Sequence, residues 1–416
     1  MRFDYNNRKV LISIFFIALI VRLFALVVVE PVSAPMTWEY EEIANNILEG
    51  KGLFWTFYNT PYRSTYMVLY PLLCSFVYAL TNHSYLALKI LQIIISLITL
   101  FLVYRISFRL FDQRVALLSL FLAGFHPGLI FYSVRLHSLT LDTFLFTLQF
   151  FLFLKILERK SIDRFSLLFG ITFGLALLSR STIAPFLFVV LLFIFLKLRD
   201  DKALCVRVIT LILISITVVL LPLWVRNYIV FDRVVISPND SALAFWLGYN
   251  EDATGTNKTL NGDFIFEIAP QEFRKTILSM DEFGQKEYFY KQGLEFIKQH
   301  PLESLVLYFK KIKYFWWFTP TQGLEYPKVY FDIYKFYWIF ILAFFILGIY
   351  QKFATGLTSQ SIKYGTISVV LFLVTLTLVH ALYNLDGRHR WAVESFVLIF
   401  AANGINFLLK KKEQRR

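Results

Sequence analysis

Apolar stretches of about 15–20 residues recur along the whole chain, separated by short polar segments. Stretches of this length and apolarity are typical of helices that cross a bilayer. The pattern predicts spans near residues 11–29, 87–104, 115–134, 139–157, 166–179, 183–197, 208–225, 333–350, 364–382 and 391–409. We therefore expect an all-α polytopic membrane protein with about ten transmembrane helices.

One apolar segment is too short for this scheme. Residues 67–81 (MVLYPLLCSFVYALT) contain Pro71 and two tyrosines. If they crossed the membrane, the basic segment RISFRLFDQR that comes after the next span would lie outside, against the usual excess of Lys and Arg in cytoplasmic loops. We interpret residues 67–81 as an interfacial or re-entrant helix on the outer side.

Composition and charge support this interpretation. The chain is 57% hydrophobic with 46 Phe, and its formal net charge of +13 comes largely from short loops and the C-terminal tail. These cations set topology rather than bind nucleic acid, and they place both termini in the cytoplasm. The two cysteines predict neither a disulfide framework nor a cysteine metal site. The inner cations are Arg2, Arg8, Lys9, Arg105, Arg109, Arg114, Arg159, Lys160, Arg164, Arg199, Lys202, Arg207, Lys352, Lys363, Lys410, Lys411, Lys412, Arg415 and Arg416.

Two large segments then lie outside the membrane. We divide the chain into an N-terminal transmembrane module (1–225) that carries the first outer loop (30–86), a large outer loop (226–332), and C-terminal helices with a basic tail (333–416). In the second loop, an amphipathic helix is expected near residues 281–299, ended by Pro301. The aromatic and lysine-rich stretch after it suits a helix in the membrane interface or an aromatic belt before the next span.

A set of arginines departs from the charge rule. Basic residues at the outer membrane face need anionic partners, either the outer acids or a lipid phosphate, which guanidinium groups bind in a planar, bidentate way. Each one alone could snorkel to a lipid headgroup, but together they predict a dedicated lipid-phosphate site. The outer arginines are Arg63, Arg135, Arg180, Arg226, Arg388 and Arg390, and a further one, Arg22, lies within the first span.

Acids share this outer face, in the stretch TWEYEEIANNILEGKGL (residues 37–53). If Thr37 caps a helix, Glu39, Glu42 and Asn46 fall on a face away from the apolar stripe. Acids in a first helical turn also suit the helix dipole without any further role. Beside a phosphate site, however, a carboxylate has a chemical use, since it can take the proton of an attacking hydroxyl or amine.

Several segments, in order, resemble the GT-C glycosyltransferases that use polyprenyl-phosphate sugars, in the branch of the protein O-mannosyltransferases and the bacterial aminoarabinose transferases. These segments are EYEEIANNILEGKGL, STYMVLYPLLCSFVYALT, FHPGLIFYSVRLHSLTLDTFLF, LALLSRSTIAPFLF, LLPLWVRNYIVFDRVVIS, LGYNEDATG and GRHRWAVESFVLIFAANGI. The resemblance implies a GT-C-type helical bundle, a catalytic acid in the first outer loop and a donor lipid near the C-terminal basic motif.

The resemblance also assigns candidate residues. The family's usual aspartate precedes the helix tyrosine, Tyr40, by four, and Met36 stands there. Glu39 is therefore the expected base, with Glu42 as its rival, and Asp142 is expected to be a satisfied buried acid. The substrate-binding candidates are Tyr40, Arg63, Arg135, Arg180, Arg226, Arg388, His389 and Arg390. No cofactor is required; a divalent metal would find at most a weak site at Glu39 and Asp142.

The sequence thus predicts an inverting glycosyltransferase of the inner (plasma) membrane, acting at the outer face. Its partners would be a polyprenyl-phosphate sugar donor, membrane lipids and a lipid, glycan or protein acceptor. The alternatives are an O-antigen ligase or polymerase that uses a diphosphate-linked oligosaccharide, and a lipid flippase or transporter. A transporter would carry charges near the bilayer midplane and usually an internal repeat, and the sequence shows no repeat.

Overall fold

The computed structural model describes residues 5–64, 67–235, 241–321, 327–356 and 359–414. Arg2, Arg415, Arg416 and part of the turn-rich outer stretch (237–240) lie outside these residues. Helices dominate the described chain, and one small antiparallel hairpin, β1 (Trp55–Phe57) and β2 (Thr60–Tyr62), pairs Trp55 with Tyr62.

The predicted spans are confirmed as helices. Nine helical segments of the described chain are long and apolar enough to cross a membrane. A tenth is the pair α5 and α6, which bends by 55° at a short break. The bundle helices are α1 (Tyr5–Val28), α4 (Tyr85–Leu110), α5 (Gln113–Gly124), α6 (Pro127–Ser133), α7 (Leu139–Leu157), α8 (Ile162–Ser179), η1 (Ser181–Ile183) with α9 (Ala184–Leu198), α10 (Lys202–Phe231), α17 (Lys328–Ala354), α18 (Gln360–His380), and η2 (Gly387–His389) and η3 (Trp391–Val393) with α19 (Glu394–Glu413).

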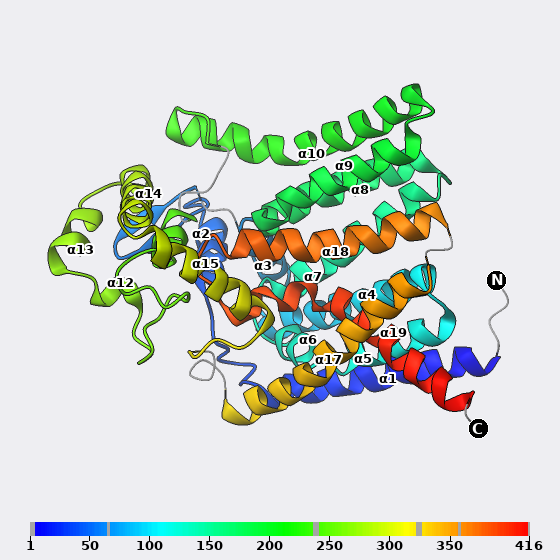
Figure 1. The fold of residues 1–416 in the computed structure, drawn as a ribbon. Helices are drawn as coiled ribbons and strands as arrows, with labels where there is room; N and C mark the ends of the chain where they lie inside the picture. The colour runs from blue at the N-terminus through cyan, green and yellow to red at the C-terminus, as the bar shows by residue number, and fades with distance from the viewer. Residues whose placement is uncertain (1–4, 65–66, 236–240, 322–326, 357–358, 415–416) are drawn as a thin grey trace.

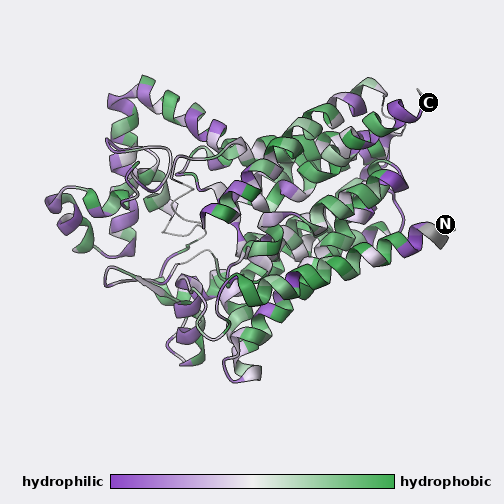
Figure 2. Ribbon diagram, turned by 90° about the horizontal axis from the view of Figure 1, so that it is seen from below, coloured by the Kyte–Doolittle hydropathy of each residue, from purple (hydrophilic) through white to green (hydrophobic). Residues whose placement is uncertain are grey.

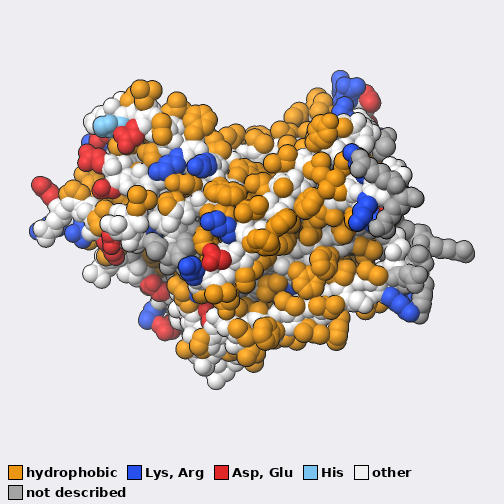
Figure 3. Space-filling model, turned by 60° about the horizontal axis from the view of Figure 1, so that its bottom comes forward, with side chains coloured by type: hydrophobic (Ala, Val, Ile, Leu, Met, Phe, Trp, Pro, Cys, Tyr) orange, Lys and Arg blue, Asp and Glu red, His pale blue; other side chains and the backbone are white. Residues whose placement is uncertain are grey.

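The bundle shows the surface of a multi-pass membrane protein. The ribbon of the bundle is coloured mostly as hydrophobic residues in Figure 2. In Figure 3, hydrophobic side chains cover the flank of the bundle in a broad band, and most charged side chains lie toward its two ends. Both chain ends lie at one end of the bundle (Figure 1). There, Arg114 at the start of α5 pairs with Glu413 at 2.6 Å, and Lys410 pairs with Asp112 at 3.1 Å.

Close helix crossings hold the bundle together. At the crossing of α17 and α19, a Cβ on Gly348 would overlap the Phe400 carbonyl, and one on Gly404 would overlap the Phe344 carbonyl. Small residues that allow backbones to approach are the usual means of helix packing in membranes, where burial of apolar surface from water gives little driving force. These two glycines therefore fix how closely the C-terminal helix packs.

The two segments predicted to lie outside the membrane, called the outer segments below, are at the opposite end of the bundle, at the left of Figure 1. They contain α2 (Glu39–Leu48), the hairpin, α3 (Leu69–Thr81), α11 (Ser241–Leu247), α12 (Ile265–Ile268), α13 (Gln271–Leu278), α14 (Glu282–Gln299) and α15 (Pro301–Trp316). The short segment at 67–81 forms the 13-residue helix α3, and the two helices expected on either side of Pro301 are α14 and α15.

The two outer segments share one apolar cluster. Phe57 and Tyr62 of the hairpin pack with Trp246, Phe266 and Phe289 of the second segment. Polar contacts join the same parts, since the Glu282 carboxylate accepts from the backbone and hydroxyl of Ser64 at 3.1 and 2.8 Å. The three-part division of the chain remains a prediction, but these outer parts fold against each other.

Candidate functional site

Helix α2 presents the predicted acids at the outer end of the bundle. It begins at Glu39, after Trp38 in an extended conformation, and not with a Thr37 cap. Tyr40 and Ile43 are buried, whereas Glu39 and Glu42 are half-buried on another face. Asn46, which was expected on this face, is buried instead, and its amide donates to the Phe54 carbonyl at 3.0 Å to hold the loop after the helix.

The three acids of the first turn have different surroundings. Glu41 accepts from the hydroxyls of Tyr78 and Tyr85 at 2.7 and 3.2 Å and lies 2.9 Å from His83 Nε2, so it clamps α2 to α3 and α4. Glu39 lies near the Arg388 guanidinium. Burial raises the pKa of the Glu39 carboxyl, and the Arg388 charge only partly opposes this. A carboxylate with a raised pKa is a stronger base than an exposed one.

His137 lies at the centre of the site. Its ring meets the rings of Trp38, Tyr40 and Tyr132 edge-on, at centroid distances of 5.8, 5.5 and 5.1 Å. Burial and the charges of Arg388, Arg180 and Arg135 hold the pKa of the imidazole well below its usual value. His137 is therefore neutral at neutral pH, and three predicted arginines surround it.

The tautomer of His137 matters for what the site binds. Its Nδ1 accepts from the Leu139 backbone N–H at 3.1 Å, so the neutral ring carries its proton on Nε2. Arg388 Nη1 lies 3.4 Å from that Nε2. Two N–H donors so close do not bind each other. An anionic oxygen that both groups could reach would accept from both.

Arg388 is fixed by its neighbours. Its Nε pairs with Asp386 at 2.8 Å, and its guanidinium lies 5.0 Å from the centre of the Trp38 ring. His389, the next predicted residue, is half-buried; its Nδ1 accepts from the Asp386 N–H at 3.3 Å and its ring lies 4.9 Å from that of His380. Asp386 thus anchors both side chains of the basic motif.

Arg390 turns away from this group. It is 1% exposed, and its guanidinium donates to Glu394, to the Phe315 carbonyl at 2.9 Å and to the Tyr334 hydroxyl at 2.6 Å. Glu394 also binds His126. The structure therefore places Arg390 in a buried network behind the site and not beside Arg388.

Arg180 connects to the centre through a chain of hydrogen bonds. Its Nε pairs with Asp142 at 2.9 Å, and Asp142 also accepts from Ser179 and Ser138 at 2.5 and 3.1 Å. The Ser138 hydroxyl lies 3.4 Å from that of Tyr40. Asp142 is thus a satisfied buried acid, as expected. It binds Arg180 directly and is linked to Tyr40 through the Ser138 hydroxyl.

Arg135 lies beside Met36, the position at which the resemblance implies an aspartate. Its Nε lies 3.3 Å from Glu30, and its Nη2 donates to the Met36 sulfur at 2.8 Å. Glu30 in turn pairs with buried Lys89 at 2.9 Å. The arginine near Met36 is therefore balanced by Glu30, at the end of the first span.

The last two predicted arginines lie at the outer hairpin. Arg226 donates to the carbonyls of Leu53 and Arg63 at 2.9 and 2.7 Å, which fastens the first outer loop to α10. The Arg63 side chain is exposed. The structure thus gathers Arg135, Arg180 and Arg388 around His137, and gives Arg226 a role in holding the loop.

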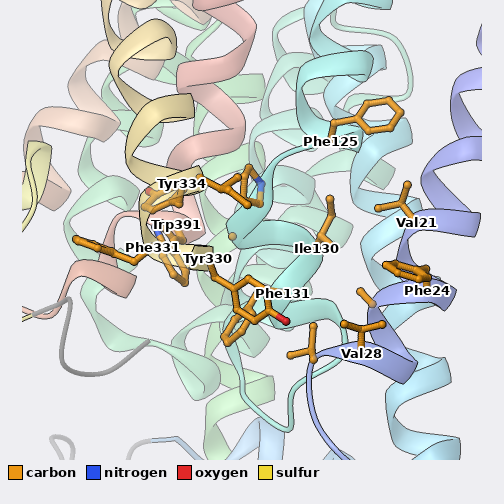
Figure 4. Close-up of a pocket in the computed structure, with 15 residues that line it drawn as sticks. Val21, Phe24, Val28, Phe125, Ile130, Phe131, Tyr330, Phe331, Tyr334 and Trp391 are labelled. Atoms are coloured by element: carbon orange, nitrogen blue, oxygen red, sulfur yellow. The ribbon is translucent and has the colours of Figure 1, made fainter. Parts of the chain in front are cut away.

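An apolar groove of about 320 Å³ runs beside this site, between α1, the α5–α6 break and α17 (Figure 4). Val21, Phe24 and Val28 line one side, and Phe331, Tyr334 and Trp391 line the other. The Trp391 ring meets Tyr132 at 5.1 Å, and Tyr132 meets His137. One ring, that of Tyr132, therefore lies between the groove wall and His137.

Sequence reasoning missed several of these residues. His137 stands between Arg135 and Ser138 in the loop that joins two predicted spans, and a histidine beside an outer arginine is the signal that would have found it. Trp38 and Asp386 both contact Arg388, and their patterns in the sequence give no sign of these contacts. Within the described residues, no group of three or more His, Cys, Asp or Glu side chains is placed to hold a metal ion.

Comparison with known proteins identifies the fold. Residues 66–226 match the family model of dolichyl-phosphate-mannose-protein mannosyltransferases, which is less than half of the chain. No curated protein matches. The apo crystal structure of the Archaeoglobus fulgidus oligosaccharyltransferase superposes with a TM-score of 0.58 at 18% identity, over 96% of this chain and 50% of that one.

Two further structures are similar. The archaeal oligosaccharyltransferase AglB from Archaeoglobus fulgidus, in complex with an inhibitory peptide and a dolichol-phosphate, matches with a TM-score of 0.54 at 15% identity, over 98% of this chain and 51% of that one. ArnT from Cupriavidus metallidurans bound to undecaprenyl phosphate matches with a TM-score of 0.45 at 11% identity, over 93% and 77%. This chain spans about half the length of the two archaeal oligosaccharyltransferase chains.

Proposed function

We propose that this chain, which has the GT-C fold, is a membrane glycosyltransferase that moves a sugar from a polyprenyl-phosphate carrier to an acceptor at the outer face of the plasma membrane. One observation carries the proposal. Arg388 and His137 hold adjacent N–H groups near the half-buried carboxyl of Glu39, and only the Tyr132 ring separates His137 from the wall of an apolar groove.

Each part of the site matches one part of the donor. The groove would hold the first isoprene units, because it is apolar and is lined by residues of α1 and α17. The Arg388 guanidinium and the His137 Nε2–H would hold the phosphate, with Arg135 and Arg180 adding positive potential. The sugar would then lie toward α2, where Glu39 and Trp38 face the site.

The reaction is derived from this placement. An acceptor hydroxyl or amine attacks C1 of the sugar while Glu39 takes its proton. The C1–O bond to phosphate breaks, its electron pair leaves with the polyprenyl phosphate, and Arg388 stabilises the growing charge. Attack from the side opposite the phosphate inverts the configuration at C1. The base and the cations come from the protein, so the proposed mechanism requires no divalent metal.

The charge balance favours a monophosphate over a diphosphate donor. Arg135, Arg180 and Arg388 each face a carboxylate, from Glu30, Asp142 and Asp386. Glu30 is shared with Lys89, so these four cations exceed the three acids by one charge. A sugar phosphodiester carries one negative charge, whereas a diphosphate carries two. A diphosphate would need more positive charge that is not already paired with an acid, so this site suits the phosphodiester better. The family match points to the same class of donor.

Binding of undecaprenyl phosphate to the purified protein in lipid nanodiscs tests the proposal, with native mass spectrometry as the readout. We expect binding to the wild type, and a loss of about tenfold or more in Arg388→Ala, since a charged hydrogen bond to phosphate is removed. Arg109→Ala, at the other end of the bundle, is the matched control. Equal binding by all three proteins, or none by the wild type, would refute the proposed site.

A further inference from the structure

Arg22 is a charged residue that the proposed chemistry does not use. It lies in α1, six residues before the helix ends at Val28, which is about 9 Å along the helix axis. Its side chain is fully buried in the bundle. Within the described part of the chain, no carboxylate pairs with it. A cation at this depth is costly in a membrane protein, so its partners should explain why it is there.

One of those partners lies at the break between α5 and α6. Arg22 Nη1 donates to the carbonyl of Gly124, the last residue of α5, at 3.1 Å. It also donates to Ala18 within α1, and Nε donates to Ser96 of α4 at 2.9 Å. A helix that ends inside the bundle leaves its last carbonyls without partners, and a guanidinium there satisfies one of them and suits the helix dipole.

The break is held from the other side as well. His126, in the break, accepts from the Leu129 N–H at 3.0 Å and so begins α6, while its Nε2 binds Glu394. The Tyr337 hydroxyl of α17 donates to the Leu122 carbonyl in the last turn of α5 at 2.9 Å. Arg22 is the member of this set that comes from α1.

Two residues of the proposed donor site follow α6 in the chain. Helix α6 ends at Ser133, and Arg135 and His137 come immediately beyond it in the chain. Phe125, Ile130 and Phe131, from the break and α6, form one wall of the apolar groove (Figure 4). The direction of α6 therefore affects both where His137 and Arg135 lie and how wide the groove is.

We infer that Arg22 is a positioning residue for donor binding: through the Gly124 carbonyl it sets the bend between α5 and α6 and so places His137 and Arg135. Arg22 does not touch the donor itself. The effect of Arg22 on donor binding rests on the proposed function. The effect of Arg22 on the direction of α6 does not, because it is a property of the fold.

Two variants test it. Arg22→Met removes the guanidinium and keeps an apolar side chain of similar length, and Arg22→Lys keeps the charge with a single donor group. Hydrogen exchange of the peptide covering residues 125–138 measures the hold on α6. We expect exchange about tenfold faster than in the wild type for Arg22→Met and an intermediate rate for Arg22→Lys. Peptides from α7 should be unchanged.

The same proteins are then assayed with undecaprenyl phosphate in nanodiscs. We expect about tenfold weaker binding for Arg22→Met, partial recovery for Arg22→Lys and no change for Arg109→Met. Unchanged exchange at 125–138 would overturn the inference, and so would faster exchange with undiminished binding. If the wild type binds no polyprenyl phosphate while Arg22→Met still loosens α6, the proposed function fails and the role of Arg22 in the bend stands.

Discussion

Replacing Glu39 by Gln tests the assignment of the base most sharply. The amide has nearly the same size as the carboxyl, so the packing of α2 against Arg388 should persist. It cannot take a proton at neutral pH, and it leaves Arg388 without that nearby acid. Because Asp386 still pairs with Arg388 at 2.8 Å, we expect the arginine to keep its position. Binding of the donor lipid should therefore change by less than about threefold.

The loss should appear in the chemical step. A general base contributes about 10²–10⁴-fold to rate, so kcat should fall by that factor, which is about 3–5 kcal/mol in the barrier. The assay measures transfer from a polyprenyl-phosphate sugar at saturating donor, beside donor binding in the same nanodiscs. Glu42→Gln is the matched control, one helical turn further along α2, and should keep at least about a third of the activity.

Two results would refute this reasoning. Full activity in Glu39→Gln would remove Glu39 from the mechanism, and loss of activity in Glu42→Gln alone would move the base there. Loss of donor binding in Glu39→Gln, with kcat unchanged, would show that the carboxyl organises the phosphate site instead.

Further predictions concern the rest of the site. Because burial raises the pKa of Glu39, kcat/KM should fall on acidification at a pH above the ordinary carboxyl value of 4.5, and Glu39→Gln should lose that dependence; a limb at or below 4.5 would contradict it. His137→Phe should weaken donor binding about tenfold, with a modest fall in melting temperature because the Leu139 N–H loses its acceptor, and equal binding would show that Nε2–H makes no contact with the phosphate. Arg390→Ala should lower stability by about 3–5 kcal/mol, measured by thermal unfolding in detergent, since it removes the arginine partner of buried Glu394, which then keeps only His126 and Tyr334; a stable variant with a selective binding defect would place Arg390 at the donor. Chelation with EDTA should leave transfer unchanged, and a loss that Mg²⁺ or Mn²⁺ restores would require a metal in the mechanism.

The membrane fold could be read from the sequence because its signals are local. Apolar length predicts the spans, and it predicts the bent pair α5–α6 as one span at 115–134. The break itself was not predicted, although His-Pro-Gly at residues 126–128 is a strong local signal for one. Helix α2 begins later than expected because Trp38 is extended and its ring lies over Arg388.

The site was less accessible to sequence reasoning, because its residues come from distant segments. Charge position alone identified Arg135, Arg180 and Arg388, which the structure gathers. It could not separate them from Arg390, only two residues beyond Arg388, since a turn of 3₁₀ helix sends the two side chains to different sides. Nor could it reveal that Arg226 would bind loop carbonyls.

The central claim is that the site cleaves the bond between a sugar and a polyprenyl monophosphate. Its most direct test supplies the purified protein with a panel of radiolabelled polyprenyl-phosphate sugars and their diphosphate counterparts, and measures release of the free carrier. We predict release of polyprenyl phosphate from at least one monophosphate donor, abolished in Glu39→Gln. Release only from a diphosphate donor, or from none of the panel while the protein remains folded, would contradict the account.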